Sequence, residues 1–198
     1  MYSEKLQIRY SKEGDAFYAP KIHQMYKEEA SRGDIGLAVR PVSYLNRVIS
    51  EGKGVLAFYE NELAGFCYIE TWEHEQYLAN SGLIVVPGMR GMGIARKIKK
   101  GAFELSRRLF PQAKLFGITT HSAVMRINAE LGYIPVTYTK LTQDPSFWKG
   151  CESCRNFDIL TRTGMNDCLC TAMIYNPENT HHHDKEKQLL KEKDRTGI

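Results

Sequence analysis

The stretch Arg90-Gly91-Met92-Gly93-Ile94-Ala95 follows an apolar run over 83–87 and leads into a basic, amphipathic segment. This order predicts a strand, a tight turn and a helix. Glycines in such a turn let the backbone approach a ligand closely, because no Cβ stands in the way. The first N–H groups of the helix have no partner within it, and the helix dipole favours negative charge there. The stretch therefore predicts a phosphate site, to which Arg90 and Arg96 add positive charge.

Two better-known phosphate-binding loops do not fit this stretch. A P-loop requires the pattern GxxxxGK[ST], and no Gly-Lys pair followed by Ser or Thr occurs in the chain. A dinucleotide fingerprint requires GxGxxG near the start of a βαβ unit, with an acidic residue about 20 positions later. Gly88, Gly91 and Gly93 are spaced differently, and they lie in the middle of the chain. The glycines therefore indicate another kind of phosphate site.

Hydrophobic spacing predicts alternating strands and helices on both sides of the turn. Apolar residues recur every three or four positions over 14–31, as in a helix, and Pro20 implies a start near residue 17 or a kink. Further helices are expected over about 41–50, 94–109 and 122–130, and strands over 6–10, 55–59, 63–70, 77–86, 115–119 and 133–138. This alternation by itself predicts an α/β domain.

The spacing Arg-x-x-Gly-x-Ala after a Val-x-Pro strand end resembles the acyl-CoA-binding motif of the GNAT superfamily of N-acetyltransferases. The order of expected elements over about 5–140 is also similar to the GNAT fold, a mixed central sheet flanked by helices. The resemblance implies acetyl-CoA or another acyl-CoA as acyl donor and no required metal. It implies that the CoA diphosphate is held by Arg90, Gly91, Met92, Gly93, Ile94 and Ala95. It further implies that pantetheine pairs with the backbone of Ile84, Val85 and Val86.

One expected catalytic position departs from the family pattern. In many GNAT proteins a tyrosine on the helix after the fifth strand protonates the departing CoA thiolate. Alignment on Leu131-Gly132-Tyr133 places Asn128 at that position, and an amide cannot supply a proton as a phenol can. His121 falls where family members often carry a CoA-contacting asparagine. We therefore expect Asn128 to contact the cofactor, while another group or water protonates the thiolate.

Attack of an amine on a thioester also requires a group that accepts the proton of the amine. Glu70, Glu73 and His74 lie on or just after the third expected strand, whose end borders the substrate cleft in the GNAT fold. Glu70 is the first candidate base and Glu73 the second, since a carboxylate acts as a base when burial raises its pKa. His121 is the alternative base, and His74 a candidate acceptor contact. A solvated hairpin turn is the competing interpretation for 73–75. A strand amide near Val85 is expected to hold the oxyanion.

The wider pattern, from Asn80-Ser81-Gly82-Leu83 to Phe147-Trp148-Lys149-Gly150-Cys151, is similar to a GNAT subgroup of Bacteroidetes-type bacteria. That subgroup is associated with arginine biosynthesis, so this resemblance implies glutamate or a similar amino acid as acceptor. An anionic acceptor needs cationic partners, for which Arg40 and Arg47 are the candidates. An ordinary surface position remains the alternative for both.

Four cysteines lie beyond the region that resembles the family. Cys151 and Cys154 form a CxxC pattern, and Cys168 and Cys170 form a CxC pattern. Together they could form a Cys₄ zinc site, but strand neighbours face opposite ways, and buried thiols are the favoured interpretation. We assign no metal. Residues 156–160 and 169–175 are interpreted as two strands of a β extension.

Composition restricts the class of protein further. The chain has 198 residues, 42% of them hydrophobic and 25% charged, with a net charge of +4. This charge is too small to indicate nucleic-acid binding, and no apolar run approaches the roughly 20 residues that span a bilayer. The start lacks the apolar stretch of a signal peptide. We therefore expect a cytoplasmic protein with no nucleic-acid or membrane partner, either alone or as a homodimer.

Three regions are expected along the chain. Residues 1–140 are predicted to form the acyl-CoA-binding and catalytic domain, 141–177 an extension packed on it, and 178–198 a polar, flexible tail with a short helix over 185–195. The leading function is acyl transfer to the amine of a small molecule. The alternatives are a protein or peptide N-acetyltransferase and a CoA-binding regulator without turnover.

Overall fold

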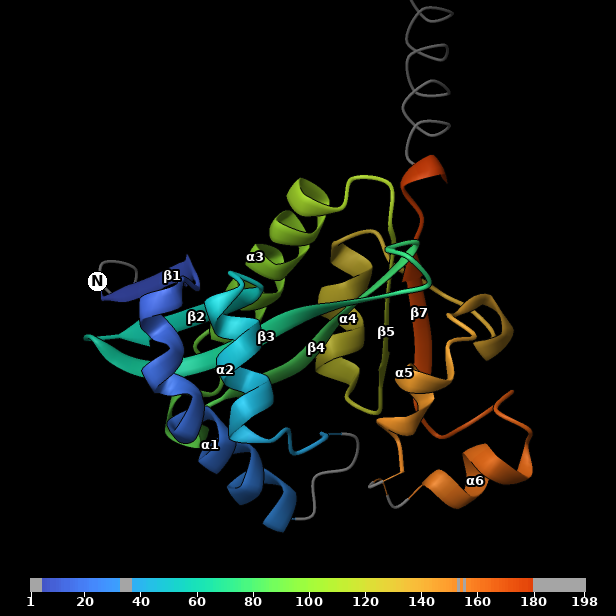
Figure 1. Ribbon diagram of the computed structural model, residues 1–198, viewed down its shortest axis with the longest axis horizontal. Coiled ribbons are helices and arrows are strands. Elements are labelled where there is room, and N and C mark those ends of the chain that lie inside the picture. Colours follow the sequence, from blue (N-terminus) through green and yellow to red (C-terminus); the bar gives the residue numbers. More distant parts are fainter. Residues whose placement is uncertain (1–4, 33–36, 153, 155, 180–198) are drawn as a thin grey trace, which may run out of the picture.

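A seven-stranded mixed sheet forms the centre of the computed structural model, which describes residues 5–32, 37–152, 154 and 156–179. The strand order is β1-β2-β3-β4-β5-β7-β6 (Figure 1). The strands are β1 (Leu6–Tyr10), β2 (Gly54–Tyr59), β3 (Glu62–Trp72), β4 (Tyr77–Val85), β5 (Lys114–Thr119), β6 (Ile134–Pro135) and β7 (Thr171–Tyr175). Only β4 and β5 pair in parallel, and all other neighbours are antiparallel. The expected α/β fold with a mixed sheet is confirmed.

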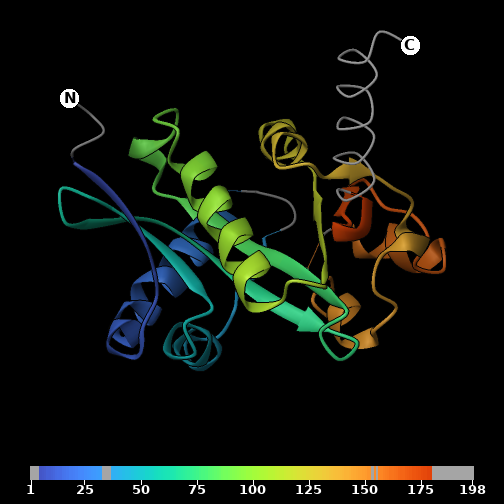
Figure 2. The same ribbon diagram turned by 90° about the horizontal axis from the view of Figure 1, so that it is seen from above.

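The helices cover both faces of the sheet. They are α1 (Ala19–Ser31), α2 (Val42–Ser50), α3 (Ile94–Leu109), α4 (Ser122–Glu130), α5 (Pro145–Lys149) and α6 (Phe157–Arg162). Alternate residues of β2 face opposite sides: Leu56 and Phe58 pack with α1 and α2, whereas Val55 and Ala57 pack with α3. Figure 2 shows α1 and α2 on one side of the sheet and α3 on the other. A third cluster joins β5 and β7 to α5 and α6.

The centre of the sheet opens where β4 and β5 separate. These two strands pair only from Tyr77–Lys114 to Ala79–Phe116. Beyond that point β4 has an irregularity opposite β3, where the register shifts between Phe66 and Tyr68. Gly82 lies in this irregularity with a φ of 62°, a conformation that favours glycine. The two strands therefore diverge around a gap that starts beside Asn80.

The structure corrects two expected strands. Residues 156–160 form the start of α6 rather than a strand, because Phe157 and Leu160, three positions apart, both pack into the third cluster. An ion pair of 2.8 Å between Asp158 and Arg162, one helical turn apart, also supports the helix. The strand expected over 133–138 is only β6, and Tyr138–Lys140 form a 3-10 turn.

The helix expected over 14–31 and the strand expected over 169–175 are both present in the structure. The helix expected over 14–31 is a 3-10 turn, η1 (Glu13–Tyr18), followed by α1, with Pro20 in the first turn of α1. The strand expected over 169–175 is β7, which lies between β5 and β6 and so belongs to the main sheet. The helix expected over 185–195 lies outside the described residues. Within the described part of the chain, no helix is both long and apolar enough to cross a membrane.

Candidate active site

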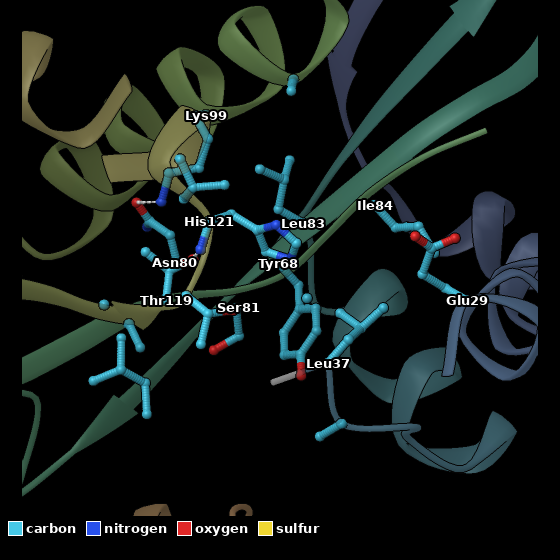
Figure 3. Close-up of a pocket in the computed structure, with 18 of the residues that line it drawn as sticks. Glu29, Leu37, Tyr68, Asn80, Ser81, Leu83, Ile84, Lys99, Thr119 and His121 are labelled. Atoms are coloured by element: carbon cyan, nitrogen blue, oxygen red, sulfur yellow. Dashed lines mark hydrogen bonds between the residues drawn. The ribbon is translucent and has the colours of Figure 1, made fainter. Parts of the chain in front are cut away.

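A cavity of about 380 Å³ occupies the gap between β4 and β5. Its walls come from both faces of the sheet and from the segment around α5. The lining includes Glu29, Arg40, Tyr68, Glu70, Asn80–Val85, Arg90, Ala95, Lys99, Gly117–His121, Phe147, Gly150 and Cys151. Figure 3 shows side chains from β4, β5, α3 and the α1 side converging on this space. The cavity therefore reaches Arg90 and Ala95, at the two ends of the glycine turn, as well as Glu70 and His121, which the sequence suggested as catalytic. Its lining does not include Gly91, Met92, Gly93 or Ile94 between those ends.

The glycine turn has the geometry of an anion site. Gly91 and Gly93 have φ values of 81° and 75°, and nothing lies within 4 Å of where a Cβ would stand on either. Gly93 is the N-cap of α3, and Lys97 N–H donates the first bond across that end, to Gly93 O at 3.2 Å. The three amides before Lys97 thus have no partner within the helix. Ile94 is buried in the core, so only its backbone can contribute to the site.

Arg90 is held by protein groups. Its Nη2 lies 2.7 Å from a carboxylate oxygen of Glu29 in α1, and its Nε donates to Val85 O at 3.2 Å. The hydrogen bond from Arg90 is the main reason that the pKa of Glu29 is lowered. Arg90 was expected to contribute its charge to phosphate binding. The structure shows that part of this charge is neutralised, which leaves the backbone amides as the main donors.

The edge of β4 that faces β5 is open above Ala79. Ile84 and Val85 line the cavity there, as expected for residues that would pair with pantetheine. Val86 does not line the cavity, because its N–H donates to Ala64 O at 2.9 Å, on the β3 side. Met92 and Ala95 pack partly against the core beneath α3.

Glu70 and Arg40 form one cluster at the cavity wall. Arg40 Nη2 lies 3.4 Å from Glu70 Oε1, and Arg40 Nε donates to the Tyr68 hydroxyl at 2.9 Å. The Tyr44 hydroxyl donates to the same Glu70 oxygen. The second oxygen, Oε2, is buried and accepts no hydrogen bond from the described residues. One carboxylate oxygen is thus held by two donors, while the other lacks a partner in this part of the chain.

The charge of Arg40 is secured by its surroundings. Burial alone would lower its pKa, but the nearby Tyr68 and Glu70 raise the pKa of Arg40 above its usual value. Burial raises the pKa of Tyr44 well above that of an ordinary phenol, with Glu70 adding to the effect, so Tyr44 stays a donor. Arg47, the other candidate cation, is exposed and pairs with Glu51 at 3.5 Å, outside the cavity lining.

The hairpin between β3 and β4 does not reach the cavity. Glu73 Oε1 accepts hydrogen bonds from Thr142 Oγ1 at 2.6 Å and Gln143 N–H at 2.7 Å, so this carboxylate ties the hairpin to the segment before α5. His74 is exposed, and 73–75 all have positive φ values. The cavity lining includes neither Glu73 nor His74, in agreement with the interpretation of a hairpin turn.

His121 and Asn128 lie in different environments. His121 is the N-cap of α4 and lines the cavity, as expected. Asn128 is 1% exposed and packs against Met173, with 3.9 Å between Nδ2 and the sulfur. It is not part of the cavity lining, against the expected cofactor contact. The helix α4 turns Asn128 inward, toward β7.

Sequence reasoning missed a buried lysine. Lys99 is 2% exposed, lines the cavity, and lies 3.5 Å from Asn80 Oδ1 through its Nζ (Figure 3). Its place four positions after Ala95 and three before Ala102, which both face inward, was the available signal. The neighbouring Lys97 and Lys100 are exposed, so the buried Lys99 does not stand out from them by residue type.

The cysteines of the C-terminal segment are free thiols in the structure. Cys151 lines the cavity, and burial raises the pKa of this thiol to about 11, with Cys154 and Cys168 contributing. Burial also raises the pKa of Cys170 to about 12. In the described ranges, no three His, Cys, Asp or Glu side chains are arranged to hold a metal ion.

Comparisons with known proteins agree with this geometry. The model of the acetyltransferase (GNAT) family matches residues 19–123. No curated protein matches the chain in sequence. N-acetylglutamate synthase from Neisseria gonorrhoeae, solved with coenzyme A and N-acetyl-glutamate, is similar with a TM-score of 0.62 and 17% identity. That likeness covers 86% of this chain and 35% of the synthase, so the chain spans about a third of its length.

Two further solved structures are similar over most of their length. Rv2747 from Mycobacterium tuberculosis, solved with CoA and NLQ, has a TM-score of 0.61 and 20% identity, covering 86% of this chain and 98% of Rv2747. A phosphinothricin acetyltransferase from Sinorhizobium meliloti, solved with AcCoA, has a TM-score of 0.58 and 14% identity, covering 87% of this chain and 88% of that enzyme. At these identities the likeness concerns the fold.

Proposed function

Because the chain belongs to the acetyltransferase (GNAT) family, whose model matches more than half of it, we propose that it transfers an acyl group from acetyl-CoA to the amine of a small amino acid. Glutamate or a similar acidic amino acid is the proposed acceptor, and another acyl-CoA is the alternative donor. The observation that carries this proposal is the buried, unpartnered Oε2 of Glu70 in a cavity that ends at the glycine turn.

The donor binds along β4. The amides at the start of α3 hold the diphosphate, because the positive φ values of Gly91 and Gly93 keep the turn open to a ligand. Pantetheine runs from there into the gap between β4 and β5 and pairs with the free edge at Ile84 and Val85. Solved GNAT structures similar to this chain contain CoA or acetyl-CoA, which supports this donor.

The acceptor binds at the cluster of Glu70 and Arg40. An amino acid offers an ammonium group to the unpartnered oxygen of Glu70 and a carboxylate to Arg40. Glu70 takes the proton of the ammonium group, and the neutral amine attacks the thioester carbon. A backbone N–H of β4 near Val85 stabilises the oxyanion, and the C–S bond then breaks.

A small acceptor suits this cavity better than a polypeptide. Phe147, Gly150 and Cys151, from the C-terminal segment, line the cavity and narrow the approach to Glu70. A protein N-acetyltransferase needs an open groove for an extended chain, so it is the second candidate. The similar N-acetylglutamate synthase from Neisseria gonorrhoeae has been solved with N-acetyl-glutamate and with L-arginine, which favours an amino acid over other amines.

A thiol-release assay tests the proposal. The chain is incubated with acetyl-CoA and each member of an amino-acid panel, and free CoA thiol is measured. We expect release with glutamate or another acidic amino acid and not with peptides. Release with a peptide alone would favour the protein acetyltransferase. CoA binding without release by any amine would instead support a CoA-binding regulator.

A further inference from the structure

Lys99 is a buried lysine for which the described residues offer no carboxylate partner. Its side chain points from α3 into the cavity, and within the described residues it has no ion-pair partner. Among the described residues, its one hydrogen bond, at 3.5 Å, is to the amide oxygen of Asn80. A buried ammonium group that lacks a partner is costly, so an anion bound in the cavity would stabilise the charged form of Lys99.

The groups around Lys99 hold it in place. Asn80 Oδ1 also accepts from the Tyr133 hydroxyl at 2.9 Å, and Asn80 Nδ2 donates to Ser106 Oγ at 2.9 Å. These two bonds fix the orientation of the amide, with its oxygen toward Lys99 (Figure 3). Lys99 Nζ also lies 5.7 Å from the centre of the Tyr133 ring. The ammonium nitrogen is thus aimed at the cavity by a rigid support.

This position coincides with the reactive end of the proposed donor. Val85 lies next to the glycine turn, and about 16 Å of strand separates Val85 from Asn80. Pantetheine that pairs with this edge of β4 directs its sulfur toward Asn80, where β4 and β5 close together. Lys99 stands at that closed end, on the α3 side of the sheet, while Glu70 and Arg40 approach from the α2 side.

We infer that Lys99 stabilises and protonates the CoA thiolate, the role for which Asn128 is chemically unsuited and sterically withdrawn. The inference rests on the proposed function. When the amine nitrogen bonds to the acyl carbon, the C–S bond breaks and its electron pair moves to sulfur. The Lys99 ammonium group gives its proton to that sulfur, which yields the amide and CoA thiol. Lys99 regains a proton from solvent, which receives the one that Glu70 took from the acceptor.

The surroundings of Lys99 suit a proton donor. Burial lowers the pKa of Lys99 below its usual value, and the Cys67 thiol of β3 opposes this effect. The other groups that face it are the Tyr133 phenol and, across the cavity, His121. Burial raises the pKa of the Cys67 thiol to about 11 and that of Tyr133 further, so both are neutral at physiological pH. A thiolate is then the only anion that forms beside Lys99.

The ionisation of bound CoA tests this inference without knowledge of the acceptor. CoA is titrated in complex with the wild-type chain, and thiolate is followed by ultraviolet absorbance, with calorimetry to confirm binding. We expect the pKa of the bound CoA thiol to lie at least one unit below that of free CoA, which is a tenfold gain in acidity. A pKa of the bound thiol equal to or above that of free CoA would overturn the inference, whatever the variants show. If CoA did not bind, the proposed function itself would fail.

Two matched variants assign the effect to Lys99. Lys99→Met keeps the length of the side chain and removes the charge, whereas Lys100→Met removes an exposed charge from the same helix. We expect the pKa of the bound CoA thiol to return to that of free CoA in Lys99→Met and to stay lowered in Lys100→Met. The value of kcat should fall about a hundredfold in Lys99→Met alone. An unchanged shift in folded Lys99→Met would contradict the inference. Acylation of Lys99 itself, detected by intact mass after incubation with acetyl-CoA, would also overturn it, because the lysine would then act as a nucleophile.

Discussion

The guanidinium of Arg90 lies 2.7 Å from the carboxylate of Glu29, and this contact joins the glycine turn to α1. Glu29 also pairs with Arg32 at 3.2 Å, so it balances two arginines from a position that is almost completely buried. The side-chain charge beside the turn is therefore already partly balanced. We therefore propose that anion binding at the turn depends on the backbone amides and on the conformation of the two glycines more than on the arginine.

Gly93→Asp is expected to weaken acetyl-CoA binding at least tenfold, or about 1.4 kcal/mol. The new carboxylate would stand at the open N-terminus of α3, where the diphosphate is proposed to bind. Gly93→Asn is the matched control, because it carries the same side-chain volume and backbone strain without the charge. Calorimetry with acetyl-CoA measures both. Equal affinities of the two variants would show that charge at this turn plays no part.

Glu70→Gln is expected to lower kcat about a hundredfold and leave acetyl-CoA affinity unchanged. The amide keeps the shape of the side chain but cannot take the proton of the acceptor. Glu73→Gln is the control, since Glu73 stands on the adjacent hairpin, where its side chain accepts hydrogen bonds from Thr142 and Gln143 outside the cavity lining. That variant should keep its kcat and lose about 1 kcal/mol of unfolding free energy. A loss of kcat in Glu73→Gln alone would reverse the assignment of the base.

Arg40→Lys is expected to raise the KM for the acidic acceptor about tenfold while the KM for acetyl-CoA stays the same. Lysine keeps the charge but loses the planar donor set that reaches Tyr68 and Glu70 together. Arg47→Lys, an exposed change on α2, provides the comparison and should leave both constants unaltered. Initial-rate kinetics distinguish the two. A parallel change in both KM values would place Arg40 outside acceptor binding.

Asp15→Asn is expected to destabilise the fold by about 2 kcal/mol at neutral pH. Asp15 accepts two hydrogen bonds from Arg9, at 2.6 and 2.7 Å, and the bond from Arg9 is the main cause of its lowered pKa. Because the pKa of Asp15 is lowered in the folded state, its ionised carboxylate stabilises the fold at pH values above the ordinary carboxyl pKa of 3.8. This contribution is lost as the pH falls through the lower, folded pKa.

Urea unfolding between pH 7 and pH 3 measures this dependence. The difference in unfolding free energy between the wild type and Asp15→Asn should decrease as the pH falls below about 4. Glu62→Gln, which removes an exposed ion pair with Lys21, should show almost no effect at any pH. A constant difference in unfolding free energy between pH 7 and pH 3 would indicate that the ionisation of Asp15 does not contribute to stability.

Local patterns in the sequence were enough to predict most of the fold. The turn at 90–95 and the strands and helices around it have clear periodicity, and the structure confirms them. The strand predicted over 156–160 was wrong, because five residues with three apolar side chains fit a strand or a helix equally well. The packing of both Phe157 and Leu160, three positions apart, against the third cluster decides for α6.

The site was predictable where a residue's position in its element determines its direction. Glu70 could be found because it lies near the end of a strand that borders the gap. Lys99 was harder to find, because its helical spacing from the inward-facing Ala95 and Ala102 is the one signal that separates it from the exposed lysines beside it. Asn128 aligned with a functional position, but packing against Met173 turns it away from the cavity. Whether such a side chain points toward the cavity or away from it depends on tertiary contacts.

The place of β7 has a consequence for how the chain folds during synthesis. β7 stands between β5 and β6, although it follows both in the sequence. Until residue 175 has left the ribosome, β6 has no neighbour in the sheet and β5 presents an unpaired edge beside apolar Phe116 and Ile118. This edge of β5 is therefore covered late, by the last strand of the described residues, and the incomplete sheet is prone to edge-to-edge aggregation until then.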